Sequence, residues 1–281
     1  MTSFIQDQVN IINSTLKARQ VFRWASKVRK MNTDYVISYE ESMTNSILSA
    51  LTNLEAERWC DRETALQGVE SKVLSAVVSV LSSDIHKESY MAVRTLYAID
   101  SLMCLEWYGP LCIIETAVPH LVNNMISGDV DEAEICLMAL RTICMKQPEA
   151  KQRCIDLGII PHIKKNLENT NLRVVSRTMR LLHTLQLKSP TMVAEYVGGG
   201  IVPSIVALLS LPYLEYNRDL VDIKYLALSI IQSTMAASNI YNDVFISAGI
   251  LPVLETIYSA GEPGWGYTDP LIESIRRLTS V

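Results

Sequence analysis

The sequence predicts an all-α protein, a solenoid of stacked three-helix repeats, and the first observation behind this prediction is a recurring turn. A Gly-aliphatic-aliphatic-Pro segment ends at Pro161, Pro203 and Pro252, and a weaker Thr-Ala-Val-Pro copy ends at Pro119. The four prolines lie 42, 42 and 49 residues apart. A fixed period in this range is typical of repeat proteins, whose units cannot bury an apolar face alone and therefore stack.

The second observation is that helical patterns follow one another in the same order between the prolines. A short helix follows the proline, a long helix comes next, and a short connecting helix leads to the next turn. Proline suits a first helical turn because its missing N–H has no intrahelical partner there, and glycine permits the sharp turn before it. The expected long helices cover residues 90–105, 131–146 and 172–187, and the expected connecting helices cover 111–116, 149–157 and 191–197.

The chain is expected to begin with a helical cap over residues 1–60 and to continue with about four to five repeats over 61–281, which end in a capping helix. Apolar residues at three- and four-residue spacing predict helices in both regions. The expected helices are 4–31, 39–57 and 69–81, a short helix that begins at 61, and a last helix at 271–278. A break is expected over 31–34, and irregular loops are expected over 211–219 and 261–270.

One unit carries a resemblance to a known family. Residues 136–143 read Cys-Leu-Met-Ala-Leu-Arg-Thr-Ile, and Gln-Pro-Glu-Ala at 147–150 and Gly-Ile-Ile-Pro at 158–161 follow. This pattern resembles an armadillo repeat, a unit of three helices of about this length. The resemblance covers residues 61–281 and implies a right-handed superhelix. The related HEAT repeats are the alternative, but the three-helix unit and the Gly-x-x-Pro turn favour armadillo.

The resemblance also implies where a ligand would bind, because the third helix of each armadillo unit lines a concave groove. In nuclear-import receptors of this family, a Trp and an Asn one turn apart recur on that helix and hold an extended peptide. The Asn positions lie nineteen residues before each proline here and hold Asp100, Thr142, Thr184 and Ser233. The Trp positions hold Leu96, Met138, Arg180 and Ser229. Since no unit has the pair, basic localisation signals are not the expected ligands.

The residues that stand in these positions still suggest peptide binding. A row of Asp, Thr and Ser side chains would donate and accept hydrogen bonds along an extended backbone. The nearby side chains of Arg141, Arg177, Arg180 and His183 would favour acidic residues. The alternative is that all of these are ordinary solvated residues on a concave surface.

The charges are distributed unevenly along the chain. The net charge is −5, yet residues 1–31 hold six basic side chains against one acidic residue, Asp7. The acidic remainder argues against nucleic-acid binding. Arg19, Arg23, Lys27 and Lys30 fall on one face of the first helix. This face is either a solvated side of a capping helix or a docking face for an acidic partner or an anionic membrane.

The sequence carries no enzyme signature and no cofactor or metal motif. It lacks a phosphate-binding glycine loop, a nucleophile elbow and a zinc-protease pattern. The six cysteines include no C-x-x-C pair, so we expect buried thiols in a reducing, cytoplasmic compartment. No apolar run of the length that spans a bilayer is expected.

The predicted function is therefore that of a non-catalytic cytoplasmic scaffold or adaptor. It would bind an extended or helical segment of a partner protein along the groove, without a cofactor. Two alternatives are a chaperone-like or transport adaptor, and a membrane-associated assembly factor that uses the basic N-terminal helix. Nothing in the sequence selects an oligomeric state.

Overall fold

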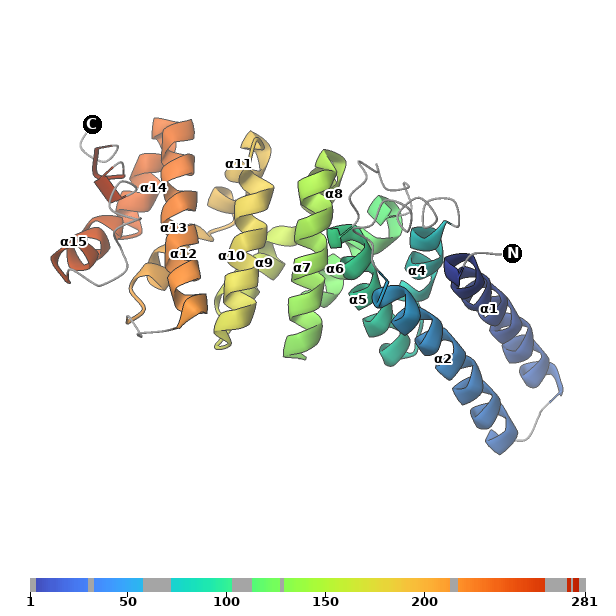
Figure 1. Ribbon diagram of the computed structural model, residues 1–281. Helices are drawn as coiled ribbons and strands as arrows, with labels where there is room; N and C mark the ends of the chain where they lie inside the picture. The colour runs from blue at the N-terminus through green and yellow to red at the C-terminus, as the bar shows by residue number, and fades with distance from the viewer. Residues whose placement is uncertain are drawn as a thin grey trace. The chain divides into compact units, whose positions relative to one another are not determined.

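The computed structural model (Figure 1) describes residues 4–29, 33–57, 72–102, 113–126, 129–212 and 217–260, together with 272–273 and 275–277. Every regular element in these ranges is a helix, as the sequence predicts. The chain divides into two compact units, unit 1 over Met1–Leu121 and unit 2 over Val122–Val281. This division does not fall at residue 60, and the expected cap over 1–60 stays a prediction.

Unit 1 is built from helices that share one core. Ile5 and Ile12 of α1 and Ile47 and Leu51 of α2 are buried, and α1 packs against α2, which packs against α5. These residues lie on one side of each helix because they recur at helical spacing. The elements are α1 (Phe4–Arg29), α2 (Thr33–Glu55), α4 (Val73–Leu81), α5 (His86–Leu102), the π-helix η1 (Ile113–Ala117) and α6 (Val118–Asn124), whose last residues belong to unit 2.

Unit 2 contains three long helices, α7, α10 and α13, that lie side by side (Figure 1), with α10 in the middle and in contact with both others. Shorter helices join them and pack behind them. The elements are α7 (Val130–Lys146), α8 (Pro148–Asp156), α9 (Ile159–Leu167), α10 (Leu172–Gln186), α11 (Pro190–Gly198), α12 (Val202–Leu209), α13 (Arg218–Ala237), the 3-10 helix η2 (Asn239–Tyr241), α14 (Asn242–Ser247) and α15 (Ile250–Ala260).

The recurring turn has the backbone conformation that its glycine predicts. Gly158, Gly200 and Gly249 have φ angles of 69°, 71° and 85°, in the left-handed region that residues with a Cβ adopt only at a cost. A helix starts within two residues of each glycine. The repeat proline therefore lies in the first turn of that helix, which confirms the predicted role of the motif.

Several helix boundaries differ from the expected ones. α2 begins at Thr33, well before residue 39, so the predicted break over 31–34 is wrong at its second half. α5 begins at His86 and not at 90, while α4 begins only at Val73 and not at 69. The features expected within 58–71, 103–112, 213–216 and 261–270, including the helix start at 61, lie outside the described residues.

Helix α13 corrects the expectation that no apolar segment reaches the length of a membrane span. By length and composition alone, Arg218–Ala237 is long and apolar enough to cross a membrane. Within unit 2 this composition has another explanation, because the helix is flanked by α10 and α12. Ile223, Ala227 and Ile230 are fully buried there, as expected for a central helix that is covered on more than one side.

Candidate functional site

The candidate site is one side of the three long helices of unit 2. Each helix begins with a side-chain cap, which fixes where its first turn starts. Asp129 accepts hydrogen bonds from the N–H groups of Asp131 and Glu132, and Asn171 and Asn217 cap α10 and α13 in the same way. We name this side the α7–α10–α13 face, and its members are Glu134, Met138, Arg141, Thr142, Arg177, Arg180, His183, Thr184, Asp222, Ser229 and Ser233.

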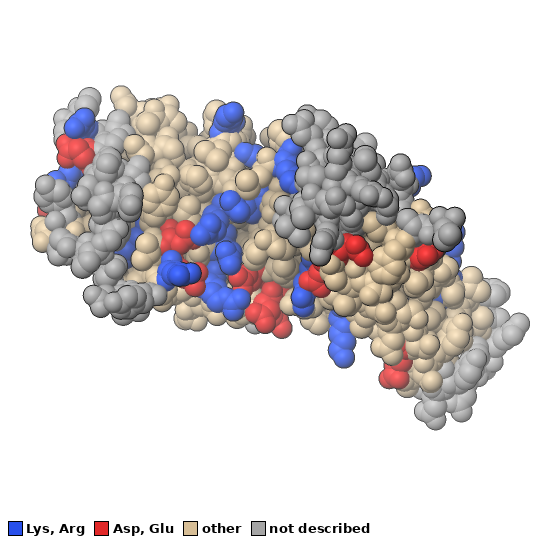
Figure 2. Space-filling view, in the orientation of Figure 1, with Lys and Arg blue, Asp and Glu red and all other residues tan. Residues whose placement is uncertain are grey.

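Contacts between helices show that these residues share a side. Arg177 of α10 pairs with Glu134 of α7, and Arg180 of α10 pairs with Asp222 of α13. Figure 2 shows acidic and basic side chains gathered together over the region of α10 and α13. The predicted groove positions of unit 2 are thus brought together by the fold.

Three hydroxyl groups of the face are not available as donors to a peptide, which corrects their expected role. Thr142 donates to the Met138 carbonyl at 3.0 Å, and Thr184 donates to the Arg180 carbonyl at 2.9 Å. Ser233 makes the same bond to the Ser229 carbonyl at 2.8 Å. A hydroxyl that bonds back to its own helix keeps only its acceptor capacity. These three hydroxyls therefore do not donate to a peptide carbonyl. Thr142 can still accept from a peptide N–H, whereas Thr184 is buried and Ser233 already accepts from Gln186 at 2.8 Å.

Arginines and carboxylates connect the three helices in a ladder. Glu134, which is 7% exposed, accepts from Arg173 and from Arg177 Nε, the latter at 2.9 Å. Asp222 accepts from Arg180 Nε at 2.7 Å and from the Ser176 hydroxyl at 2.8 Å. Charge-assisted hydrogen bonds of this kind are the stronger ones in proteins. The ladder therefore joins one repeat to the next.

The ladder engages only part of each guanidinium group. Arg177 and Arg180 use Nε, and among the described residues their Nη atoms form no hydrogen bond. Both side chains are about one-third exposed, at 32% and 38%. The Nη atoms provide donors in a planar fork that matches a carboxylate or phosphate. The face thus offers donors to an anion although its arginines are already paired.

His183 lies in the last turn of α10, the middle one of the three long helices. Its Nε2 is 3.2 Å from the Ser229 hydroxyl of α13. Burial lowers the pKa of His183 below its ordinary value, and the positive charge of Arg141 on α7 lowers it further. The imidazole is therefore neutral at pH 7 and would gain a proton more readily if an anion bound beside it.

The structure describes the side chain of one of the two predicted groove residues of unit 1. Leu96 is fully buried in α5, so it is a core residue and the prediction that it contacts a ligand is wrong. The side chain of Asp100 lies outside the described residues. The Trp position of the import receptors is thus replaced here by a leucine that points into the core.

Two members of the basic face predicted on α1, Arg19 and Arg23, form internal contacts. Arg19 is 4% exposed and reaches both carboxylate oxygens of Glu88 at 2.6 Å. Arg23 pairs with Glu40 at 2.6 Å and with Asp84 at 3.0 Å. The side chains of Lys27 and Lys30 lie outside the described residues. The first two basic side chains therefore bind α1 to α2 and to the segment around α5.

The described cysteines offer no nucleophile. Cys136, Cys144 and Cys154 are buried, and the sulfurs of Cys144 and Cys154 lie 3.8 Å apart. Burial raises the pKa of the Cys136 thiol, and the hydrogen bond with Cys154, together with burial, raises that of Cys144. A thiol with a raised pKa is a poor nucleophile. In the part of the chain that the structure describes, no three His, Cys, Asp or Glu side chains are grouped to hold a metal ion.

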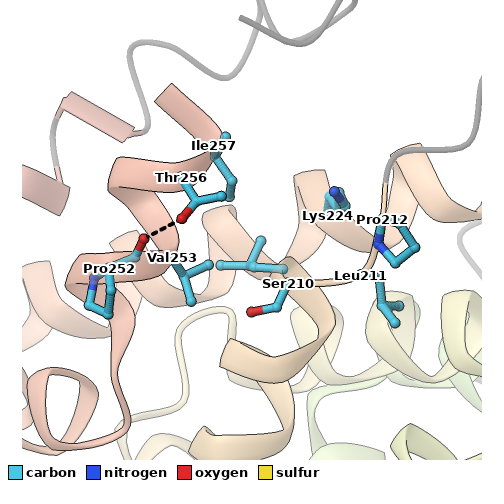
Figure 3. Close-up of a pocket in the computed structure, with 9 residues that line it drawn as sticks. Ser210, Leu211, Pro212, Lys224, Pro252, Val253, Thr256 and Ile257 are labelled. Atoms are coloured by element: carbon cyan, nitrogen blue, oxygen red, sulfur yellow. Dashed lines mark hydrogen bonds between the residues drawn. The ribbon is translucent and has the colours of Figure 1, made fainter. Parts of the chain in front are cut away.

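Unit 2 contains two hollows that the sequence patterns do not predict. One, of about 310 Å³, lies between the end of α12 and α15 (Figure 3), with Leu211, Pro252 and Val253 on its wall and Lys224 beside it. The Thr256 hydroxyl there donates to the Pro252 carbonyl at 2.8 Å, within its own helix. The other, of about 430 Å³, lies at the carboxyl ends of α10 and α13. A hollow between packed helices depends on the shapes of side chains from different repeats, and the periodic pattern of the sequence does not reveal these shapes.

The fold matches solved structures of armadillo repeat proteins. One is a computationally designed armadillo repeat protein for modular peptide recognition, with a TM-score of 0.72 and 16% identity over 98% of this chain and 99% of that chain. Another is a designed armadillo repeat protein in complex with the peptide (KR)4, with a TM-score of 0.67 and 16% identity over 99% and 100%. No protein-family model and no curated protein matches the sequence.

A natural protein appears among the matching structures too. It comes from a structure of a conserved phosphorylation switch that controls the interaction between cadherin and beta-catenin, with a TM-score of 0.64 and 14% identity over 84% of this chain and 42% of that chain. The chain therefore has an armadillo-type repeat fold, which confirms the fold class that the proline spacing and the resemblance predicted.

Proposed function

We propose that the protein is a non-catalytic scaffold that binds an extended, acidic segment of a partner protein along the α7–α10–α13 face. The observation that carries this proposal is that the guanidinium groups of Arg177 and Arg180 each use only Nε in the ladder. Among the described residues their Nη atoms form no hydrogen bond, and the carboxylates of the ladder already accept from the arginines. An acidic side chain would accept from these donors without displacing the ladder.

The relatives support the peptide part of this proposal. A designed armadillo protein of the same fold was made for modular peptide recognition, and another holds the basic peptide (KR)4. The ligand charge should differ here, because Glu134 and Asp222 are neutralised by arginines of neighbouring repeats. A basic peptide would have to compete with these arginines for the carboxylates, whereas an acidic peptide would not.

The arrangement of hydroxyl groups adds a preference for how the segment lies. Because Thr142 donates to its own helix and is partly exposed, its oxygen would accept from a peptide N–H group. Thr184 is buried, and the Ser233 hydroxyl already accepts from Gln186. A rigid face loses little conformational entropy on binding, so many modest contacts together give useful affinity.

The test is a display of random extended peptides on the full chain, followed by sequencing of the retained pool. We expect enrichment of Asp and Glu for the natural protein and loss of this enrichment for the double variant Arg177→Gln/Arg180→Gln. Gln is chosen because its amide can still donate to Glu134 and Asp222, so the ladder is partly kept.

The matched control is Lys164→Gln/Lys165→Gln, which removes the same charge from exposed side chains of α9. It should retain the acidic preference. Enrichment of Lys and Arg by the natural protein, or an equal loss in both double variants, would refute the proposal. Thermal unfolding of each variant separates lost binding from lost folding.

The membrane-associated alternative loses support from the contacts of α1. Half of the basic face on which it depended, Arg19 and Arg23, is engaged by carboxylates of unit 1. We retain the cytoplasm as the proposed compartment, in keeping with buried cysteines that form no C-x-x-C pair.

A further inference from the structure

The hollow at the carboxyl ends of α10 and α13 has features that ordinary packing does not require. It measures about 430 Å³ and lies between the last turns of these helices, the start of α11, and η2. This volume is near the lower end of the range for ligand pockets, about 300–1,000 Å³. Its lining residues are Gln186, Leu187, Lys188, Ser189, Pro190, Val193, Ser233, Ala237, Ser238, Ile240 and Tyr241.

The rim of this hollow, which we name the α10–α13 end pocket, holds apolar side chains that stay in water. Ile240 is 71% exposed and Leu187 is 48% exposed. They come from two different repeats and border the same hollow. Single exposed apolar residues are ordinary, but apolar residues that gather around a concave site mark binding surfaces.

The floor of the end pocket is polar but already satisfied. The Gln186 amide donates to the Ser233 hydroxyl at 2.8 Å, and the Gln186 carbonyl oxygen is 3.3 Å from the Tyr196 hydroxyl, which also contacts Thr234. Because these groups use one another, a polar ligand atom would gain little from them. The network instead holds the floor in one arrangement, so the pocket favours an apolar occupant.

The backbone of the rim is fixed as well. Lys188 has φ of 59°, in the left-handed region. Two hydrogen bonds hold the backbone on either side of it: Ser189 N–H to the Gln186 carbonyl at 3.0 Å, and Lys151 Nζ to the Leu187 carbonyl at 3.0 Å. A strained residue persists only where its surroundings determine it. The rim thus presents Leu187 and Lys188 in one geometry without needing a ligand.

The charge of the end pocket selects the kind of partner. Lys188 is the charged residue of the lining, and the lining contains no carboxylate. Its exposed ammonium group would pair with an acidic residue next to the apolar side chain that fills the pocket. Arg177 and Arg180 present positive donors on the same helix, α10, so pocket and face favour the same sign of charge.

Ser233 connects the two surfaces, since it belongs to the α7–α10–α13 face and also lines the end pocket. We propose that the end pocket receives one large apolar side chain, leucine or an aromatic residue, of the acidic segment that lies along the face. This inference rests on the proposed function and deepens it. The apolar side chain sets the register of the segment, and acidic residues beside it meet Lys188 and the arginines.

The test uses synthetic peptides of alternating Glu and Ser with one central residue that is either Leu or Ala, and fluorescence anisotropy with the full chain. We expect the Leu peptide to bind about tenfold or more tightly than the Ala peptide, as for anchor residues that fill a desolvated pocket. A Lys-Ser peptide with the same central Leu should bind much more weakly.

The pocket is tested with Ala237→Phe, which places a ring in the hollow, and the matched control is Ala236→Phe. Both alanines are exposed near the end of α13, but only Ala237 lines the pocket. Ala237→Phe should remove the preference for Leu over Ala, and Ala236→Phe should retain it. Should Ala237→Phe fail to fold, Ile240→Ser removes the opposite wall and should weaken the Leu peptide alone.

The outcomes separate this inference from the proposed function. Binding of both acidic peptides with equal affinity, or equal effects of Ala237→Phe and Ala236→Phe, would overturn the anchor pocket and leave the acidic face intact. Failure of every Glu-Ser peptide to bind would overturn both. If the double variant Arg177→Gln/Arg180→Gln binds the Leu peptide as tightly as the natural protein does, one segment does not occupy both the pocket and the face.

Discussion

At the residue scale, the Arg19–Glu88 pair is a buried ion pair that joins α1 to α5 in unit 1. Its members are 4% and 0% exposed, and Arg19 also donates to the Thr44 hydroxyl at 3.1 Å. Replacing Arg19 with Ala leaves a buried carboxylate without its main partner. We expect the free energy of unfolding of unit 1 to fall by about 3–5 kcal/mol, measured by hydrogen exchange of α1, α2 and α5.

The double variant Arg19→Met/Glu88→Met is the control, because it removes both charges. It should recover most of the loss, since apolar residues of similar volume often replace a buried ion pair without penalty. Burial by itself would raise the pKa of Glu88, but hydrogen bonds from Arg19, Ser83 and Thr44 hold it below the ordinary value. An Arg19→Ala variant as stable as the natural protein would contradict the role of the pair.

His183 gives a pH dependence whose sign follows from its environment. Burial and the charge of Arg141 lower its folded-state pKa below 6.5, so below about pH 6.5 the unfolded chain binds the proton more readily than the folded one. The stability that the neutral imidazole of His183 gives the folded state is therefore lost as the pH falls through the pKa of His183 in the unfolded chain. His183→Asn should lose less stability than the natural protein between about pH 7 and pH 5. Superimposable curves of unfolding midpoint against pH would contradict this.

At the element scale, Glu134 links α7 to α10. It is nearly buried and accepts from Arg173 and Arg177, so Glu134→Gln weakens two charge-assisted hydrogen bonds at once. We expect the free energy of local opening of α7 and α10, measured by hydrogen exchange, to fall by about 1–3 kcal/mol. Asp131→Asn is the control, because Asp131 is exposed and lies 3.8 Å from Arg173. It should change protection by less than about 1 kcal/mol. Equal effects would show that the ladder does not join the repeats.

The elements themselves were the most predictable part of the molecule. α7, α8, α10 and α11 begin and end within about one residue of the expected limits, because caps, prolines and apolar spacing all act locally. α2 was misjudged because Asp34 follows a polar stretch that reads as a turn. In the structure α2 begins at Thr33, so the second half of this stretch belongs to the helix.

The contacts of the site were less predictable, and the reason is physical. Counting from the prolines placed Arg177 and Arg180 correctly on the long helix but gave no information on what they touch. Their partners, Glu134 and Asp222, lie 43 and 42 residues away and become neighbours only when the repeats stack. The face that seemed basic in the sequence is therefore a paired ladder, and the basic stripe of α1 contains an internal ion pair.

At the scale of the whole molecule, the two compact units each have a core of their own. Ile47 of α2 and Ile223 of α13 are fully buried, one in each core. In repeat proteins a helix contacts only its neighbours, so a local loss of packing spreads over a limited distance. Unfolding should therefore resolve into separate regional transitions and depart from a single two-state step.

Two cavity-forming substitutions test this expectation in the full chain. Ile223→Ala should cost about 2–5 kcal/mol locally, seen as faster hydrogen exchange in α13 and in its neighbours α10 and α12, with α1 and α2 unchanged. Ile47→Ala should do the reverse, with faster exchange in α1, α2 and α5. Each variant serves as the control for the other. Faster exchange by the same amount in both units, for either variant, would mean that the chain unfolds as one cooperative body.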